Sequence, residues 1–232
     1  EQILYQRPLP GARLNMAHPL AYKMAGCWLL NENGGLRAMD LSPYGNHGTL
    51  TNFASPLPRS FNGLFFLGPG GASTGTAVNM GDVKICDFAA GSDFSLVSWV
   101  KAITSVAEQV VVSKSAAGIA EGWVLQVMSD GTIRFATGNG SAQSVKDSVS
   151  SVSDGNWHLI GVVHPGSNAQ LYLDGKPEGT LGSLTNDTVA NTSNLVIGAY
   201  SGFNYGLTNG WVGGILIWRD RVLTASDVKA LY

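Results

Sequence analysis

Short apolar runs separated by turn residues are the feature that most restricts how this chain can fold. Residues 93–101 and 123–128 alternate along the chain with period two, as expected for β-strands. Asp-Gly pairs at 130–131, 154–155 and 174–175 supply the residues that tolerate positive φ in tight hairpin turns. We therefore expect strands over the runs 26–31, 63–67, 93–101, 123–128, 157–164, 169–174, 195–200 and 211–218.

One helix is predicted, at the end of the chain. Thr224 is a good N-cap residue and Asp227 follows three positions later, which is close to a capping box ahead of an apolar face. Residues 1–23 carry several prolines and show no period, so we expect an extended N-terminal arm that lies on the domain or on a partner. No repeat or linker divides residues 24–232, and the sequence predicts a single all-β, antiparallel β-sandwich there.

Charge is scarce along the chain. Charged residues make up 13% of the sequence, about half the usual fraction of roughly 25%, and the net charge is −2. Because no basic field is available to hold phosphates, we expect no nucleic-acid partner. No stretch of about 18 apolar residues occurs, so we expect no membrane insertion. The 30 glycines, with abundant Ser, Thr and Asn, favour strands and turns over helices.

The two cysteines allow two interpretations. Cys27 lies in an apolar run, where a buried thiol is the simplest interpretation. A disulfide with Cys86 is the alternative, and it requires an oxidising compartment.

Several segments carry motifs that occur together, and in this order, in one known family. These segments are 29–35, 40–50 (DLSPYGNHGTL), 94–100 (FSLVSWV), 154–163 (DGNWHLIGVV), 170–175 (QLYLDG) and 211–232. With them, residues 24–232 resemble laminin-G-like domains of the concanavalin A-like lectin and glucanase group. The resemblance implies an all-β, antiparallel concanavalin A-like jelly-roll β-sandwich with a short C-terminal helix. The opening of the chain, residues 15–32, is similar to laminin-G-like proteins of phage and environmental genomes.

The chain lacks the carboxylate spacing that hydrolases of this fold use. Several relatives cleave glycans with a Glu-x-Asp-x-x-Glu pattern on one strand, and retaining hydrolysis needs carboxyl groups about 5–5.5 Å apart. Glu108 and Glu121, the closest two glutamates, are too far apart in sequence to share a strand. No nucleophile elbow, zinc-protease motif or phosphate-binding loop occurs. We expect no enzyme activity; a glycoside hydrolase with an Asp pair from separate strands is the alternative.

Many relatives bind calcium through loop carboxylates and carbonyls, as the resemblance implies. The candidates in this chain are Glu32, Asp40 and Asn46. The alternative for Asp40 is an Asx-turn that orders the loop after it. His158 and His164 share one face of a predicted strand, and packing or a local hydrogen bond is favoured there over metal binding. We expect no required cofactor, with calcium as an option.

Aromatic residues and asparagines gather in residues 200–211. Aromatic rings stack on the C–H faces of sugars and amides bond their hydroxyls, and a loop between two strands should lie at the rim of the sandwich. The predicted ligand-binding residues are Trp123, Phe203, Asn204, Tyr205, Asn209 and Trp211. Protein contact is an alternative use of the same residues. A further alternative is that Trp123 and Trp211 close the ends of the sandwich, while other rings form its core: Trp99, Trp157 and Trp218.

Together these features predict a non-catalytic recognition module, a glycan-binding or adhesion-type laminin-G-like domain displayed on a phage virion or a cell surface. The alternative is a purely structural virion protein, a capsid decoration or tail protein, that docks through residues 1–23. The expected partners are a glycan or protein surface, with capsid or tail subunits contacting residues 1–23, and a homo-oligomer is a further option. The expected location is the virion surface or the extracellular space.

Overall fold

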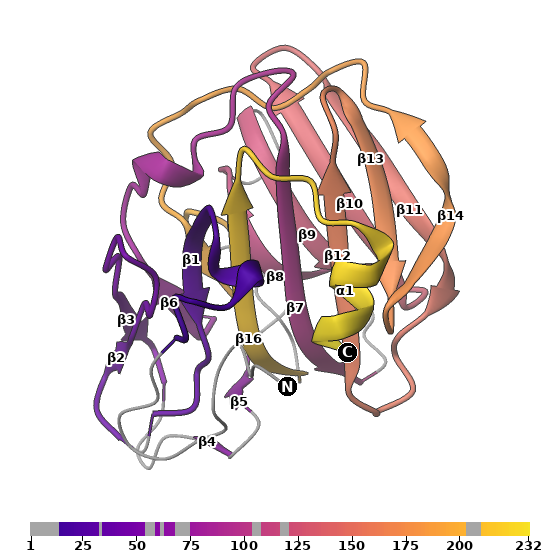
Figure 1. Cartoon of the computed structure of the whole chain (residues 1–232). Helices are drawn as coiled ribbons and strands as arrows, with labels where there is room; N and C mark the ends of the chain where they lie inside the picture. Colours follow the sequence, from indigo (N-terminus) through magenta and orange to yellow (C-terminus); the bar gives the residue numbers. More distant parts are fainter. Residues whose placement is uncertain are drawn as a thin grey trace.

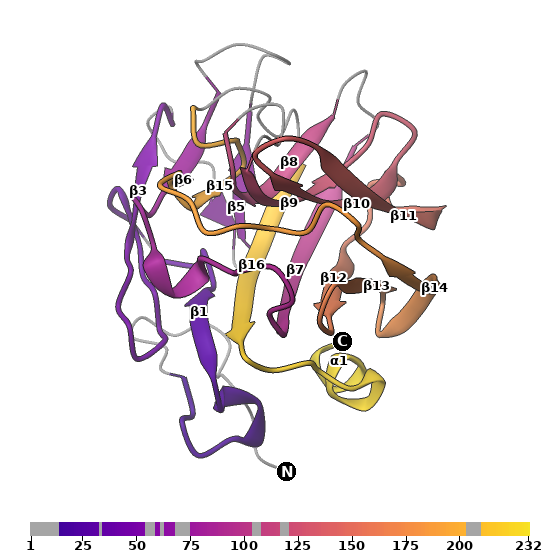
Figure 2. The same cartoon turned by 90° about the horizontal axis from the view of Figure 1, so that it is seen from above.

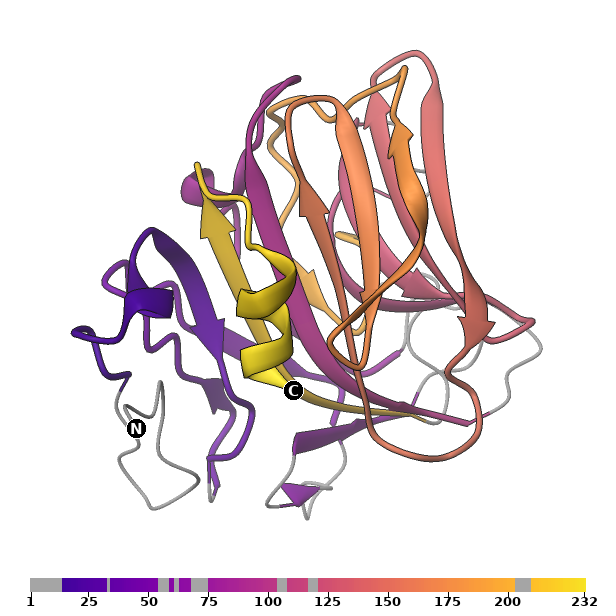
Figure 3. The same ribbon diagram turned by 45° about the vertical axis from the view of Figure 1, so that its right-hand side comes forward.

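The computed structural model shows two antiparallel β-sheets packed face to face, with one short helix near the C-terminus (Figure 1). A view turned by 45° separates the two layers (Figure 3). The all-β sandwich predicted from the sequence is thereby confirmed. The structure describes residues 14–32, 34–53, 59–60 (main chain only), 63–67, 75–103, 108–116, 121–202 and 210–232.

The longest described strand, β16 (Gly210–Arg219), lies near the centre of the first sheet. β1 (Met24–Trp28) pairs with residues 215–218 of β16, and β5 (Gly63–Phe66) pairs with residues 210–212, so β1 and β5 share one long neighbour. The order across the sheet is β14 (Lys176–Ser183), β13 (Asn168–Leu173), β12 (His158–His164), β7 (Phe94–Ala102), β16 (Gly210–Arg219), β5 (Gly63–Phe66) and β4 (Arg59–Ser60).

The second sheet lies on the other side of the core. The 3-10 helix η2 (Lys84–Cys86) lies on one connection between the two sheets, from β6 to β7. The order across the sheet is β11 (Gln143–Ser151), β10 (Thr132–Asn139), β9 (Glu121–Val127), β8 (Gln109–Lys114), β15 (Val196–Ile197), β6 (Ala77–Asn79), β3 (Gly48–Thr51) and β2 (Arg37–Ala38).

Most predicted strands lie where the sequence placed them, but the prediction misses eight strands of the described chain: β2, β3, β4, β6, β8, β10, β11 and β14. For two of these the reason is physical: β11 and β14 are edge strands with mostly exposed residues, so they carry no apolar alternation to detect. The run 195–200 forms only the two-residue β15, because the chain turns at Gly198 (φ 84°). A Cβ at this position would collide with the Phe66 ring, so glycine lets the turn pack on the core.

Two local signals in the sequence are present in the structure. Asp174 (φ 50°) and Gly175 (φ 76°) both adopt positive φ in the turn between β13 and β14, as a tight hairpin requires. Helix α1 (Ala225–Leu231) begins with a capping box, in which Thr224 and Asp227 each accept a hydrogen bond from the main-chain N–H of the other. Figure 2 shows α1 on the side of the first sheet that faces away from β8–β11.

A second cluster of buried apolar residues lies on the outer face of the first sheet, under α1. Leu14 and Leu20, from the segment ahead of β1, belong to this cluster. Trp218 Nε1 donates to the Leu20 carbonyl at 2.6 Å, which ties the 3-10 helix η1 (Pro19–Ala21) to β16. Residues 14–23 of the predicted arm therefore pack on the domain itself and belong to the folded unit; the rest of the arm lies outside the described residues.

Cys27 and Cys86 are free thiols and both are buried, which confirms the simpler interpretation of these residues. Burial raises the pKa of each thiol above its ordinary value. Both side chains therefore act as small apolar groups in the packing.

Candidate functional site

Aromatic side chains gather on the outer face of the first sheet, at the end away from β1. Val100 and Val212 pack in the main core, so their neighbours Lys101 and Trp211 point outward. Trp211 is the register partner of Phe65 on β5 and of Lys101 on β7. These three residues form a row across three neighbouring strands.

The row continues toward β12. His158, the first residue of β12, pairs with Val100, which brings the preceding Trp157 beside Lys101. Trp99 is the next outward residue on β7, and the ring of Tyr232 stacks on it with centroids 5.8 Å apart and planes at 19°. In Figure 1 the C-terminus accordingly lies over β7 and β12. We call this surface the aromatic face; its members are Phe65, Trp99, Lys101, Trp157, Trp211 and Tyr232.

The aromatic face is open to solvent. Tyr232 is 62% exposed, and the other five members are half-buried. Leu67 and Ile103 follow β5 and β7 and are 58% and 44% exposed. Phe65 and Trp211 pack on each other with centroids 5.1 Å apart and planes at 52°. Large contiguous apolar patches on a protein surface usually mark interaction sites, so this face is the best candidate among the described residues.

The tryptophans of the chain divide into two sets. One set is buried, and each indole N–H donates to a main-chain carbonyl: Trp28, Trp123 and Trp218. The other set is half-buried on the aromatic face: Trp99, Trp157 and Trp211. The alternative that placed Trp99 and Trp157 in the core with Trp218 is therefore wrong for these two residues, which are half-buried on the outer face. Conversely, the Trp123 ring, a predicted ligand-binding group, lies in the core and is not presented at the surface.

The predicted ligand-binding loop, residues 200–211, is described only at its ends. Trp211 lies on the aromatic face. Tyr200 is buried on the outer face of the second sheet, where its hydroxyl donates to Gln126 Oε1 at 3.0 Å. The remaining predicted residues lie outside the described residues, and their role stays a prediction: Phe203, Asn204, Tyr205 and Asn209.

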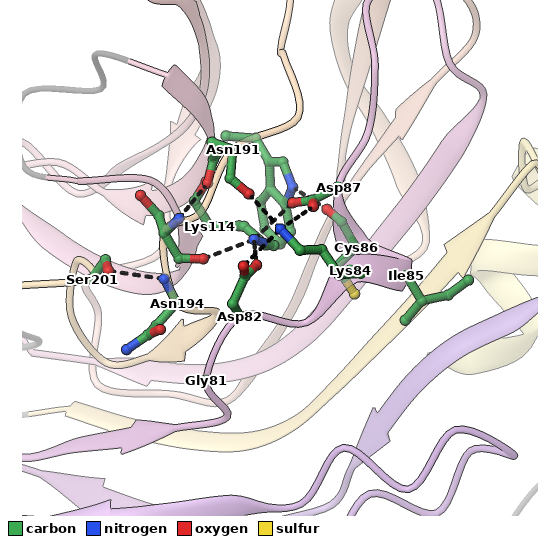
Figure 4. Close-up of polar contacts among 12 residues, drawn as sticks. Gly81, Asp82, Lys84, Ile85, Cys86, Asp87, Lys114, Asn191, Asn194 and Ser201 are labelled. Carbon is green, nitrogen blue, oxygen red and sulfur yellow. Dashed lines mark hydrogen bonds and ion pairs between the residues drawn. The ribbon is translucent and has the colours of Figure 1, made fainter.

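Sequence reasoning missed a polar cluster around a buried lysine (Figure 4). Lys114 ends β8 and is fully buried; its Nζ donates to Asp82 Oδ1 at 2.9 Å and to the Ser193 carbonyl at 2.7 Å. Asp87 Oδ1 lies 2.7 Å from the same nitrogen as an ion-pair contact, outside the direction of a hydrogen bond. Lys84 Nζ contacts the second oxygen of Asp82 at 2.7 Å. Two lysines and two aspartates thus balance one another.

The charges of this cluster reinforce one another. The hydrogen bond from Lys84 lowers the pKa of Asp82, and Lys114 adds to this effect against the opposing effect of burial. Asp82 in turn raises the pKa of Lys84. Asn191 Nδ2 donates to the Lys114 carbonyl, so the cluster joins β8 to the chain ahead of β7 and to the chain ahead of β15. Because its charges are satisfied internally, we assign the cluster a structural role.

The predicted calcium ligands Asp40 and Asn46 lie on one loop, but protein donors already engage the carboxylate. Asp40 accepts two main-chain N–H groups at Oδ1, and at Oδ2 it accepts the Ser42 hydroxyl and the Asn46 N–H, all at 2.8–2.9 Å. Glu32 accepts a main-chain N–H further along the loop. This is the loop-ordering role considered above. No group of three or more His, Cys, Asp or Glu side chains in the described ranges is arranged to hold a metal ion.

His158 and His164 lie on the same side of β12; His158 faces two carboxylates and His164 faces one. His158 Nδ1 is 2.9 Å from Asp174 Oδ2, and Nε2 is 3.0 Å from Asp154 Oδ1. His164 Nδ1 donates to a main-chain carbonyl, and Nε2 lies 3.0 Å from Asp187 Oδ1. These aspartates therefore contact basic side chains, as Asp82 and Asp87 contact Lys114.

Two stacked antiparallel sheets and a short C-terminal helix define a concanavalin A-like sandwich. A family model described as the concanavalin A-like lectin/glucanases superfamily matches residues 71–229, and the chain belongs to this family. The resemblance drawn from the sequence motifs is thereby confirmed. No curated protein matches the chain. Among the residues with described positions, no helix has both the length and the apolar character needed to cross a membrane.

Similar solved structures include binding domains of neurotoxins. A structure from work on ganglioside-dependent cell entry of botulinum neurotoxin type C matches with TM-score 0.66 and 12% identity, over 94% of this chain and 52% of that chain. The binding domain of botulinum neurotoxin DC matches in a complex with rat synaptotagmin II, with TM-score 0.67 and 15% identity, over 91% and 51%. The same domain in complex with SialylT matches with TM-score 0.65 and 15% identity, over 91% and 51%. This chain spans about half the length of these structures, and identities this low show the fold alone.

Proposed function

We propose that this domain is a non-catalytic carbohydrate-recognition module and that the aromatic face is its glycan site. The observation that supports the proposal is the row of half-buried rings across neighbouring strands of one sheet. A sheet holds such rings in place, so stacking on sugar C–H groups costs little conformational freedom. The similar neurotoxin domains, from work on gangliosides and on a SialylT complex, agree with a glycan as ligand.

The absence of catalysis is part of the proposal. Two pairs of aspartates in the described part of the chain share a basic side chain: Asp82 and Asp87 flank Lys114, and Asp154 and Asp174 flank His158. A hydrolase needs one carboxyl group that holds a proton and one that is available to the sugar or to water. A carboxylate that contacts a basic side chain favours its charged form, so it does not hold a proton, and its oxygens are not available to the sugar or to water.

A glycan array with the purified chain, followed by titration calorimetry on the best ligand, tests the glycan site. Trp211→Ala and Trp157→Ala should each weaken binding by about 1–3 kcal/mol, the range for losing a well-packed aromatic contact. Tyr44→Ala is the matched control, because Tyr44 is 55% exposed and lies outside the aromatic face. If both tryptophan variants fold and bind as the wild type does, the aromatic face is not the glycan site.

Protein contact is the second candidate use of the same face. The exposed Leu67 and Ile103 beside the rings favour it, since apolar and aromatic groups form the centres of protein interfaces. Display on a virion or cell surface, and docking of residues 1–23 on capsid or tail subunits, remain predictions from the sequence resemblance. Binding of a purified protein partner that Trp211→Ala abolishes, without any glycan ligand, would favour this second function.

A further inference from the structure

We infer that Lys101 makes the aromatic face selective for acidic glycans, in which a sugar residue carries a carboxylate. This inference rests on the proposed function, and it adds the chemical class of the ligand. Lys101 lies at the centre of the face, between Trp211 on β16 and Trp157 ahead of β12. A ligand that stacks on both tryptophans must cross the strand position of Lys101.

The ammonium of Lys101 has no partner among the described residues. No hydrogen bond or ion pair joins its Nζ to any of them, although the side chain is half-buried. The acidic residue nearest in strand register is Asp154, which bridges to Ile103. Its carboxylate instead engages Asn156 and His158. The carboxylate of Asp154 is therefore engaged by other residues, and Lys101 has no carboxylate partner among the described residues.

Apart from residues 1–13, the remaining segments of the chain offer no carboxylate side chain as a substitute. The stretches outside the described ranges, other than residues 1–13, contain no Asp or Glu: 33, 54–58, 61–62, 68–74, 104–107, 117–120 and 203–209. Lys101 is half-buried on this face and its ammonium has no protein counter-ion among the described residues, so an anion that arrives with the ligand is a favourable partner. Charge complementarity thus selects an anionic ligand for this face.

A carboxylated sugar fits this arrangement better than a phosphate ligand does. Its ring presents C–H groups for stacking, and its carboxylate lies on the same ring within reach of one neighbouring ammonium group. Binding of a phosphate chain would need a field of several cations, and the net charge of −2 provides none. One lysine between two tryptophans therefore indicates one carboxylate beside two stacked sugar rings.

The inference is tested by titration calorimetry with two acidic probes, an oligogalacturonate and sialyllactose. Each is paired with a neutral form that keeps every sugar ring, its own methyl ester. At least one acidic probe should bind about tenfold or more tightly than its neutral form, as expected for a hydrogen bond to a charged group. Lys101→Met should remove this preference and Lys101→Arg should keep it. Added salt should reduce the preference in the wild type.

Arg37→Met is the matched control, because it also removes one positive charge but lies on β2, at the edge of the second sheet. Equal binding of acidic and neutral probes, lost in Trp211→Ala and unchanged in Lys101→Met, would overturn the inference and leave the proposed function intact. Glycan binding that is unchanged in both Trp211→Ala and Lys101→Met would overturn the inference and the proposed function together. Sedimentation that shows a dimer, converted to a monomer by Trp211→Ala, would also overturn both, because a second copy of the chain would then occupy the aromatic face. Lys101→Gln replaces Lys101→Met if thermal unfolding shows that the methionine variant is unstable.

Discussion

Lys114 and Lys101 have similar local settings and opposite surroundings. Each is the strand-register partner of a tryptophan, Trp123 for Lys114 and Trp211 for Lys101. Lys114 points inward and is fully buried, with two aspartates and a main-chain carbonyl around its ammonium group. Lys101 points outward and has no such partner among the residues whose positions are described.

The difference separates a cation that the fold uses from one that is available to a ligand. Burying an ammonium group is costly unless carboxylates and hydrogen bonds surround it, so the partners of Lys114 are a condition of folding. A half-buried lysine has no such requirement, because water still reaches part of it. The aromatic face can therefore keep an unpaired charge, whereas the cluster around Lys114 cannot.

The largest expected effect comes from Lys114→Met. Removal of one partner leaves Asp82 and Asp87 without their buried counter-ion, and such a change typically costs about 3–5 kcal/mol in the free energy of unfolding. Lys101→Met should change the same quantity by less than about 0.5 kcal/mol, as for an ordinary surface substitution. Urea denaturation of the two variants measures this. If Lys114→Met and Lys101→Met both lower the free energy of unfolding by the same small amount, the contrast drawn between the two lysines is wrong.

A second comparison concerns the two halves of the outer face of the first sheet, one covered and one open. Deletion of residues 1–23 removes Leu14 and Leu20 from the covered half. Full burial of two leucine side chains contributes about 3 kcal/mol or more, so the deletion should destabilise the domain by that order. Deletion of residues 1–13 keeps both leucines and is the matched control. If thermal and urea unfolding do not distinguish the two truncations, residues 14–23 are not part of the folded unit.

The helix between the two halves should have a smaller effect. Thr224→Ala removes the capping box of α1 and should lower the free energy of unfolding by about 1 kcal/mol. Because Tyr232 follows this helix and stacks on Trp99, the variant should also weaken glycan binding slightly. Thr185→Ala, on the connection after β14, is a control for the loss of a threonine. Calorimetry on the same glycan decides whether the end of α1 supports the aromatic face.

The smallest effect is expected in the pH dependence of stability. Burial alone would lower the pKa of His158, but its hydrogen bonds with Asp174 and Asp154 outweigh burial and raise the pKa above the ordinary 6.5. The folded state thus binds this proton more tightly than the unfolded state does. The resulting stabilisation is complete below pH 6.5 and is lost as the pH rises through the raised value.

Because His158 is partly exposed, its contribution to the free energy of unfolding should stay below about 1 kcal/mol. The pKa of Asp154 shifts in the opposite direction. Hydrogen bonds from Asn156, with that of His158, lower its pKa to about 2, so its contribution is lost only in strong acid. Denaturation curves measured from about pH 5 to about pH 9 should show a shallow decline that His158→Gln removes. A decline of the same size in His158→Gln would assign it to another group.

Local patterns in the sequence were sufficient for the fold but not for the site. The Asp174-Gly175 turn and the capping box at Thr224 depend on neighbours within a few residues, and both are present. The alternating segment 94–100 is apolar on both faces, because α1 and the N-terminal segment cover part of its outer side. Its sequence therefore could not show that Trp99 lies at the boundary of an open surface.

Local sequence patterns also do not predict which side of the sheet a side chain at the end of a strand faces. Gly122-Trp123 and Gly210-Trp211 are both glycine–tryptophan pairs at the start of a strand, yet one ring enters the core and the other faces outward. Register with distant strands decides between the two, and the residues next to each tryptophan do not show that register. The same applies to Lys114, whose acidic partners are distant in sequence; a lysine ending an apolar run was the only local signal.

The most direct test of the central claim is an amide and indole NMR titration of the wild-type chain with the best glycan from the array. The indole N–H signals of Trp99, Trp157 and Trp211 should shift as glycan is added. Those of Trp28, Trp123 and Trp218 should stay in place, because they are buried and bonded to main-chain carbonyls. Saturable glycan binding that leaves the first three indole signals unmoved would contradict the assignment of the aromatic face as the glycan site.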